Sequence, residues 1–328
     1  MVATSSNGNP NRTTTTRAPR RRRACAPRSA ALDGRRRTGA LATLCLGLLT
    51  LLAVACGDDA PPADDGPQRC NGHEELCDRP FNEVVFAMTH NSMSNAQERW
   101  LAPNQNLPIE RQLEDGIRGL MLDTYEERGQ LLLCHSFCSI GSRDLVDALT
   151  GIRQFLDDNP DEVIAIIFQD AITSAQTEQA FEDSGLIRYV YTHDPDAGWP
   201  TLRQMIADDT RVFSSAESRG PPPAWYHHAW DLVQDNPYTY RFVEDFSCTR
   251  NRGGASNPLM LVNHWLQRPL PMPEYAEEAN EYEVLMEHVL RCEEERGQRV
   301  NFVGIDFHDI GDVLEVVDVL NGVREPRP

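Results

Sequence analysis

Residues 86–92 read Phe-Ala-Met-Thr-His-Asn-Ser, residues 116–123 read Gly-Ile-Arg-Gly-Leu-Met-Leu-Asp, and residues 133–136 read Leu-Cys-His-Ser. Each segment is largely apolar and contains, at or near its end, a side chain that can do chemistry: His90, Asp123 and His135. A strand of a parallel α/β barrel has this form, because its body is core and its C-terminal tip faces the active site. Two histidines and a carboxylate at such tips favour paired acid and base catalysis, with the carboxylate binding a metal or orienting a ring. A single histidine of this kind is more often a buried core residue, so the interpretation depends on three tips occurring in order.

The rest of the chain repeats the alternation of strands and helices. We expect strands over 84–90, 117–123, 131–135, 162–168, 211–214, 259–263 and 300–306, and helices over 144–157, 202–208, 282–295 and 313–320. The run 162–168 is almost continuously apolar, which is typical of a strand buried in a parallel sheet. The pattern predicts one α/β domain, a parallel barrel. A doubly wound open sheet is the alternative, but the chain has no glycine-rich phosphate loop to support it.

The N-terminal 56 residues have the composition of a targeting leader. Residues 1–34 are rich in Arg, Thr, Ser and Pro and are expected to be a disordered extension or an over-extended gene start. Arg35–Arg37 then precede the apolar run Leu41–Ala55, which is followed by Cys56. This order resembles a bacterial lipoprotein signal with Cys56 as the lipidated residue. We therefore expect an exported lipoprotein, anchored on the periplasmic or cell-surface side of a membrane.

Other interpretations of the leader remain open. The apolar run of about 15 residues is shorter than the roughly 20 that a membrane-spanning helix needs. A twin-arginine signal or simple secretion after cleavage is also compatible with the arginine cluster. Residues 57–69 are acidic and proline-rich, as a flexible tether would be, and residues 70–328 form the predicted catalytic barrel, expected to be monomeric.

The segments before and after Cys56 differ strongly in net charge. Ten of the 31 basic residues and one of the 50 acidic residues precede it, so the rest of the chain has a net charge of about −28 with histidine neutral. No lysine occurs anywhere. Such a surface argues against binding to nucleic-acid backbones and against adsorption on anionic lipid.

Six cysteines follow Cys56, an even number that indicates disulfides in an exported protein. Spacing favours Cys70–Cys77 and Cys134–Cys138 as local links and Cys248–Cys292 as a long one, although six cysteines allow 15 pairings. A zinc site is the alternative, but no pair has the two-residue spacing of a zinc knuckle.

The motifs together resemble those of the X-domain family of phosphatidylinositol-specific phospholipases C, most closely its secreted, disulfide-bearing branch. The resemblance runs from about residue 81 to residue 322. It rests on the motifs at 89–92, 119–125, 133–136, 155–163, 199–202 and 301–307. It implies an irregular (β/α)8 TIM barrel in a single domain.

The resemblance also implies roles for individual residues. His90 corresponds to the general base that deprotonates the attacking hydroxyl, and His135 to the general acid that protonates the leaving oxygen. Asp306 corresponds to a carboxylate that orients the His90 ring, although a helix-capping role is also open. Tyr125, Trp230, His264 and Trp265 are aromatic candidates for the mouth of the site, without a specific assignment.

Family members neutralise the phosphoryl charge either with an arginine two residues after the second-strand aspartate or with Ca²⁺. Position 125 is a tyrosine here, so the resemblance favours Ca²⁺ or Mg²⁺. The implied ligands are Asn91, Asp123 and Asp170 or Gln169. Met121 and Gln169 stand where the metal-dependent branch has glutamates, so we expect a thin ligand set.

The predicted function is therefore a phosphoric diester hydrolase that cleaves an inositol phospholipid or a glycerophosphodiester, through a cyclic phosphate. A non-catalytic barrel acting as a binding or cell-surface module is the alternative from another class. Among enzymes the nearest alternative is a glycerophosphodiester phosphodiesterase or a sphingomyelinase-D-like barrel. Those enzymes use a Glu-x-Asp pair on the second strand, which Met121 interrupts.

Overall fold

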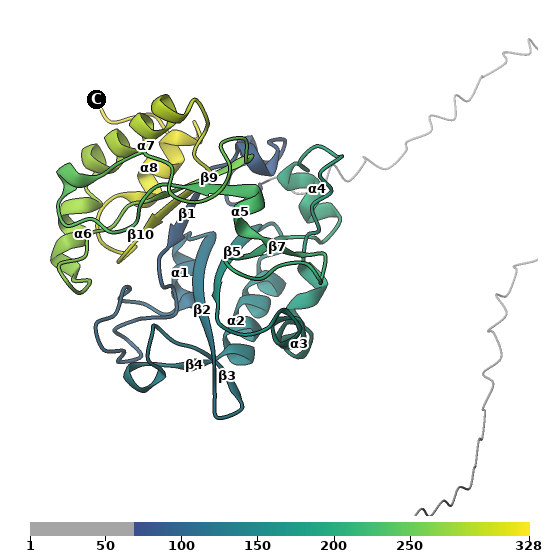
Figure 1. The fold of residues 1–328 in the computed structure, drawn as a ribbon. Helices are drawn as coiled ribbons and strands as arrows, with labels where there is room; N and C mark the ends of the chain where they lie inside the picture. The colour runs from purple at the N-terminus through teal and green to yellow at the C-terminus, as the bar shows by residue number, and fades with distance from the viewer. Residues whose placement is uncertain (1–68) are drawn as a thin grey trace, which may run out of the picture. The chain divides into compact units, whose positions relative to one another are not determined.

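The computed structural model of the protein describes residues 69–328, shown in colour in Figure 1. The predicted leader (1–56) and nearly all of the predicted tether (57–69) lie outside the described residues. Within residues 69–328, no helix has the length and apolar character needed to cross a membrane.

Eight parallel strands form the body of the fold. They are β1 (Phe86–Thr89), β2 (Gly119–Glu127), β5 (Ile164–Asp170), β6 (Val212–Ala216), β7 (Tyr226–His228), β8 (Val233–Asp235), β9 (Leu259–Asn263) and β10 (Phe302–Ile305). They pair in the order β7-β6-β5-β2-β1-β10-β9-β8, every pair parallel. This is chain order read around a barrel, except that β7 and β8, the two ends of the described sheet, do not pair with each other. The predicted irregular (β/α)8 barrel is confirmed, and its irregularity is an opening between β7 and β8.

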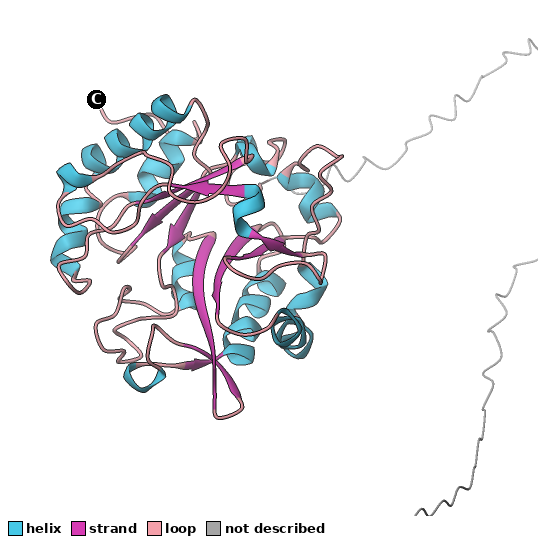
Figure 2. Ribbon diagram, viewed as in Figure 1, coloured by secondary structure: helices cyan, strands magenta, loops and turns pink. Residues whose placement is uncertain are grey.

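The helices are α1 (Ile109–Asp115), α2 (Leu145–Asp158), α3 (Ser174–Ser184), α4 (Leu202–Ala207), α5 (Ala229–Leu232), α6 (Pro273–Ala279), α7 (Tyr282–Arg296) and α8 (Val313–Leu320). Helices such as α2, α3, α7 and α8 lie on the outer side of the curled sheet (Figure 2). The sequence sets where they begin: the Asp144 side chain accepts a bond from the Asp147 N–H at the start of α2, and Thr173 forms a capping box with Gln176 at the start of α3. The four predicted helices correspond to α2, α4, α7 and α8.

One predicted strand has a different place. β2 continues past Asp123 to Glu127 and turns back through Arg128 and Gly129, whose φ angles of 56° and 81° are left-handed. The segment predicted over 131–135 is β3 (Gln130–Leu133), which pairs antiparallel with β2 and with β4 (Arg143–Asp144). His135 therefore does not stand at the tip of a barrel strand, as its motif suggested, but follows the returning arm of a hairpin.

The strands are apolar because they contribute to two layers of hydrophobic core, one on each face of the sheet. Successive residues of a strand point to opposite faces, so Val85 and Ala87 pack under the helices while Phe86 and Met88 fill the barrel. Phe81 closes the lower end of the interior against the rings of Phe86, Phe213 and Phe302. Burial of one such ring contributes about 2–3 kcal/mol. These rings fill the end of the interior opposite to the carboxyl ends of the strands.

Three disulfides join Cys70 to Cys77, Cys134 to Cys138 and Cys248 to Cys292, which confirms the preferred pairing. Among the described residues, one group of three His, Cys, Asp or Glu ligand atoms is close enough to hold a single ion: Cys248, His288 and Cys292. Because both sulfurs of that group are in a disulfide, they are not available as zinc thiolates.

Candidate active site

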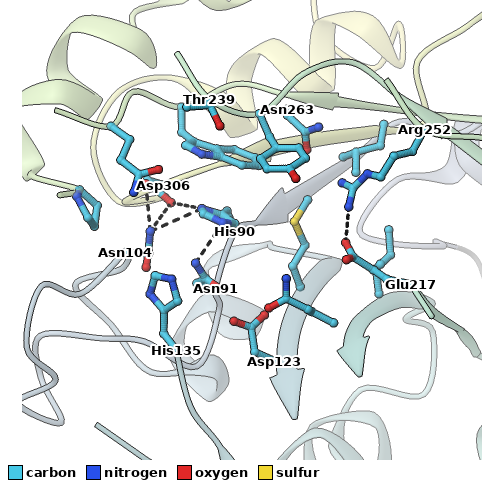
Figure 3. A pocket seen from close by; sticks show the side chains of 18 residues that line it. His90, Asn91, Asn104, Asp123, His135, Glu217, Thr239, Arg252, Asn263 and Asp306 are labelled. Carbon is cyan, nitrogen blue, oxygen red and sulfur yellow. Dashed lines mark hydrogen bonds and ion pairs between the residues drawn. The ribbon is translucent and has the colours of Figure 1, made fainter. Parts of the chain in front are cut away.

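A pocket of about 220 Å³ opens at the carboxyl ends of the strands. It lies where a barrel of this kind carries its active site. The polar side chains that line it come from many strands: His90 and Asn91 after β1, Asp123 from β2, Gln169 from β5, Glu217 after β6, Asn263 from β9 and Asp306 after β10. Figure 3 shows several of these side chains converging on the same space.

His90 is held on both ring edges and on one face. Its Nδ1 lies 2.9 Å from Oδ1 of Asp306, and its ring stacks on Trp265 with centroids 3.9 Å apart. The Asn104 amide donates to both Asp306 oxygens, at 3.1 and 3.2 Å, which fixes the carboxylate in turn. A carboxylate at Nδ1 favours the tautomer with the proton on that nitrogen, so Nε2 is left as the basic atom.

Asn91 lies next to that basic nitrogen. Its backbone is left-handed, with φ of 46°, a conformation that asparagine tolerates better than most residues. The turn brings its side-chain nitrogen to 3.0 Å from His90 Nε2. The amide therefore donates to the base, and its oxygen is left for a cation or for substrate.

His135 reaches the same pocket from the β2–β3 hairpin. The Cys134 N–H donates to the Asp123 carbonyl at 3.2 Å, and the Cys134–Cys138 disulfide closes the loop that carries the ring. Burial lowers the pKa of His135, and the neighbouring charge of His90 lowers it further. The hairpin and the disulfide thus place a second imidazole beside the first.

Asp123 is a buried carboxylate without a hydrogen-bond donor. The residue is 6% exposed, and no other described residue donates a hydrogen bond to its carboxylate oxygens. Burial raises the pKa of Asp123 to about 7, opposed by His90 and reinforced by the negative charge of Glu217. A carboxyl group in this condition is suited to a cation that would restore its charged form.

The oxygen donors of the pocket fit a hard divalent ion. Asn91 and Gln169 offer amide oxygens and Asp123 a carboxylate, the ligand types that Ca²⁺ and Mg²⁺ prefer. The pocket contains no thiolate that would favour a softer metal.

Asp170, the alternative to Gln169 in the predicted ligand set, faces away from the pocket. Its Oδ1 accepts the Ser218 N–H at 2.8 Å, and its other oxygen lies 3.8 Å from Arg219. Because neighbours in a strand point to opposite faces, only one of the pair can line the site. The structure brings Gln169 together with Asn91 and Asp123, and it does not bring Asp170 there.

Several lining residues were not predicted from the sequence. Asn104 holds Asp306, Glu217 lies beyond the end of β6, and Arg252 enters from the loop after β8. Arg252 donates to Asp235 through Nε and Nη2, at 2.9 and 2.6 Å, and to Glu217 through Nη1, at 2.8 Å. Glu217 lies three residues past the predicted strand 211–214, whereas His90 was the last residue of its predicted strand. Arg252 has no comparable signal.

Of the four aromatic candidates for the mouth, Trp265 lines the pocket and Tyr125, Trp230 and His264 do not. His264 is fully buried, 2.7 Å from His288 between their Nδ1 atoms.

Comparison with known proteins gives a consistent family. The family model described as PI-PLC X 1 matches residues 76–321. A PI-PLC X domain-containing protein of Arabidopsis thaliana is 30% identical over 271 residues, covering 74% of this chain and 63% of that protein, so the chain spans less than two thirds of that relative. An uncharacterised secreted protein of Arthroderma benhamiae is 25% identical, covering 83% of this chain and 68% of that one.

Among solved structures, a mutant of the phosphatidylinositol-specific phospholipase C of Staphylococcus aureus superposes with a TM-score of 0.54 at 12% identity. The superposition covers 80% of this chain and 98% of the bacterial one, and it shows a shared fold. The chain belongs to the PI-PLC X domain family.

Proposed function

We propose that this protein is a phosphoric diester hydrolase of the phospholipase C type, with His90 as general base and His135 as general acid. The observation that carries the proposal is that both imidazoles line one pocket and that Asp306 holds Nδ1 of the first, which leaves Nε2 as its basic nitrogen. Histidine suits this chemistry because an imidazole can both accept and donate a proton near neutral pH.

In the proposed reaction a hydroxyl of the substrate attacks the neighbouring phosphorus. His90 Nε2 accepts the hydroxyl proton as the new O–P bond forms, and the imidazolium is stabilised by the Asp306 carboxylate. His135 donates a proton to the oxygen that leaves as the other P–O bond breaks. The product is a cyclic phosphate, and water opens it when the two histidines exchange roles.

A divalent cation, Ca²⁺ or Mg²⁺, would be held by Asn91, Asp123 and Gln169. When bound, it would neutralise the phosphoryl oxygens and polarise the phosphorus for attack. Two observations support this cation. No described residue donates a hydrogen bond to the Asp123 carboxylate, and Arg252, which lines the pocket, is paired with two carboxylates, so its charge is not available to the phosphate.

The proposed substrate is an inositol phospholipid or a soluble glycerophosphodiester. Hydroxyl-rich head groups of this kind match a pocket that Thr239, Asn263 and Gln267 line with polar atoms. We further propose export, with lipid attachment at Cys56 and action as a monomer. The secreted relative and the three disulfides support export.

The test is an assay of a panel of phosphodiesters, with and without chelator, followed by ³¹P NMR. Transient cyclic phosphate from at least one hydroxyl-bearing substrate, absent with the His90→Ala variant, is the expected result. No hydrolysis of any member of the panel, with the fold intact by circular dichroism, would favour a non-catalytic binding barrel.

A further inference from the structure

The proposed cation site is short of negative charge. Of Asn91, Asp123 and Gln169, only Asp123 carries a full charge, and the other two are amides. Calcium takes six to eight oxygen ligands, and its affinity depends on how many of them are charged. A site with one carboxylate would bind a cation weakly, and a second carboxylate in the pocket would strengthen the binding.

Strand register places another carboxylate in the same row. Asp123 pairs with Gln169 across β2 and β5, and Phe168 pairs with Ala216 across β5 and β6. The Glu217 N–H then donates to the Phe168 carbonyl at 2.9 Å, which carries the alignment one residue further. Asp123 on β2, Gln169 on β5 and Glu217 just after β6 therefore stand side by side, and all three line the pocket. Neighbouring strands are about 4.8 Å apart, so Asp and Glu side chains on the outer two can meet over the middle one.

One of the two carboxylate oxygens of Glu217 is available to bind a cation. Oε1 accepts the bond from Arg252, and no described residue donates to Oε2. Arg252 does not depend on Glu217 for its charge balance, because Asp235 already accepts from its backbone N–H, Nε and Nη2. The ion pair with Arg252 therefore does not explain why Glu217 lies beside Gln169. Asp123 is 6% exposed, and its carboxylate accepts no hydrogen bond from a described residue. It is a second and independent indication that a ligand binds in this part of the pocket.

We propose that Glu217 supplies the second carboxylate of the divalent-cation site, bridging Arg252 through one oxygen and the cation through the other. This inference rests on the proposed function and extends it to a residue outside the predicted ligand set. It adds the β6 side of the pocket to the ligands that would hold the cation, so that Gln169 lies between two carboxylates.

Calorimetric titration of the purified protein with CaCl₂ and with MgCl₂, without substrate, tests this inference. Glu217→Gln removes the charge and keeps the shape, and we expect it to weaken Ca²⁺ binding at least tenfold. Gln169→Glu should tighten binding, because it adds a charge between Asp123 and Glu217. Glu110→Gln is the matched control: Glu110 also pairs with an arginine, Arg143, but does not line the pocket, and its variant should bind as the wild type does.

The outcomes separate the two proposals. Wild-type binding with an unchanged affinity in Glu217→Gln, while Asp123→Asn weakens it, would overturn the role of Glu217 and leave the proposed function intact. Hydrolysis in excess chelator, with no ion bound by the wild type, would overturn both the cation and the role of Glu217 and leave the two-histidine chemistry. Thermal unfolding of each variant identifies any loss of affinity that comes from loss of fold.

Discussion

His90 Nδ1 lies 2.9 Å from Asp306 Oδ1, although 216 residues separate the two in the chain. The contact follows from the closure of the barrel between its first and last strands. β1 and β10 pair in parallel, Thr89 opposite Ile305, so the next residue of each strand emerges at the same height. Asn104, from the loop after β1, bonds both Asp306 oxygens, and Trp265 covers the ring. The base is thus oriented by three separate segments of the fold.

Replacing Asp306 by Asn tests this orientation. An amide nitrogen facing His90 Nδ1 would donate to it, which favours the tautomer with its proton on Nε2 and removes the base. We expect turnover to fall by roughly a hundredfold, within the range that a positioned acid or base contributes. Nitrogen NMR of the imidazole should report the changed tautomer. Wild-type turnover with the altered tautomer would show that Asp306 does not act through His90.

Replacing His90 by Ala should lower turnover by roughly a hundredfold or more without unfolding the protein, and so should replacing His135 by Ala. The two roles differ in their response to the leaving group. A substrate with a nitrophenolate leaving group needs no protonation, so it should rescue His135→Ala and leave His90→Ala inactive. The measurement is kcat on paired alkyl and nitrophenyl esters. Equal rescue of both variants would contradict the assignment of base and acid.

The Cys248–Cys292 disulfide should be the main covalent support of the fold. It closes a span of 44 residues, and in the chain-entropy account that constraint is worth about 3–4 kcal/mol. Replacing both cysteines by Ala should lower Tm by roughly 6–15 °C in a domain of this size. The Cys70–Cys77 link spans only 7 residues, so its removal should cost less. Mass mapping that finds free thiols at 248 and 292 would remove the basis of the prediction.

The sequence predicted those parts of the fold that have long, continuous patterns. Apolar runs such as 162–168 and helices with an apolar stripe such as 144–157 could be located to within a few residues. β7 and β8 were missed because they have only three residues each, too few for a period to appear. The hairpin origin of His135 was missed for a related reason: a short apolar run before a polar residue looks the same in a barrel strand and in the strand that returns beside it.

At the site, the sequence found residues that end strands and missed those whose place depends on loops. Gln169 and Asp170 could not be separated, since a strand buried on both faces shows no alternation that would assign a side. Arg252 meets Asp235 across 17 residues of irregular chain, and no local pattern encodes such a contact. Asn104 likewise comes from a loop, 202 residues from the aspartate that it holds.

Chelation should abolish turnover, and Ca²⁺ or Mg²⁺ should restore it. Two anionic phosphoryl oxygens would enter a pocket that already contains Asp123 and Glu217, and Arg252 is occupied by carboxylates. Without a cation, the substrate would be repelled. The measurement is initial rate against free metal in buffered EDTA. Full activity in excess chelator would assign the neutralisation to an arginine and Asp123 to orienting a histidine.

Cation affinity should depend on pH in a direction set by Asp123. Burial raises its pKa to about 7, so below that pH the carboxyl holds a proton that the cation must displace. Affinity should therefore rise about tenfold per pH unit as pH increases towards 7, for one proton released, and level off above it. Calcium titration between pH 5.5 and 8.5 measures this. Burial also raises the pKa of Glu217, so a second proton should be released at acid pH, and the affinity should there rise by more than tenfold per pH unit.

In Asp123→Asn the affinity should be weaker at every pH and its pH dependence shallower. A wild-type affinity that stays constant across this range would show that no ion displaces the Asp123 proton, and the cation would then have to bind elsewhere.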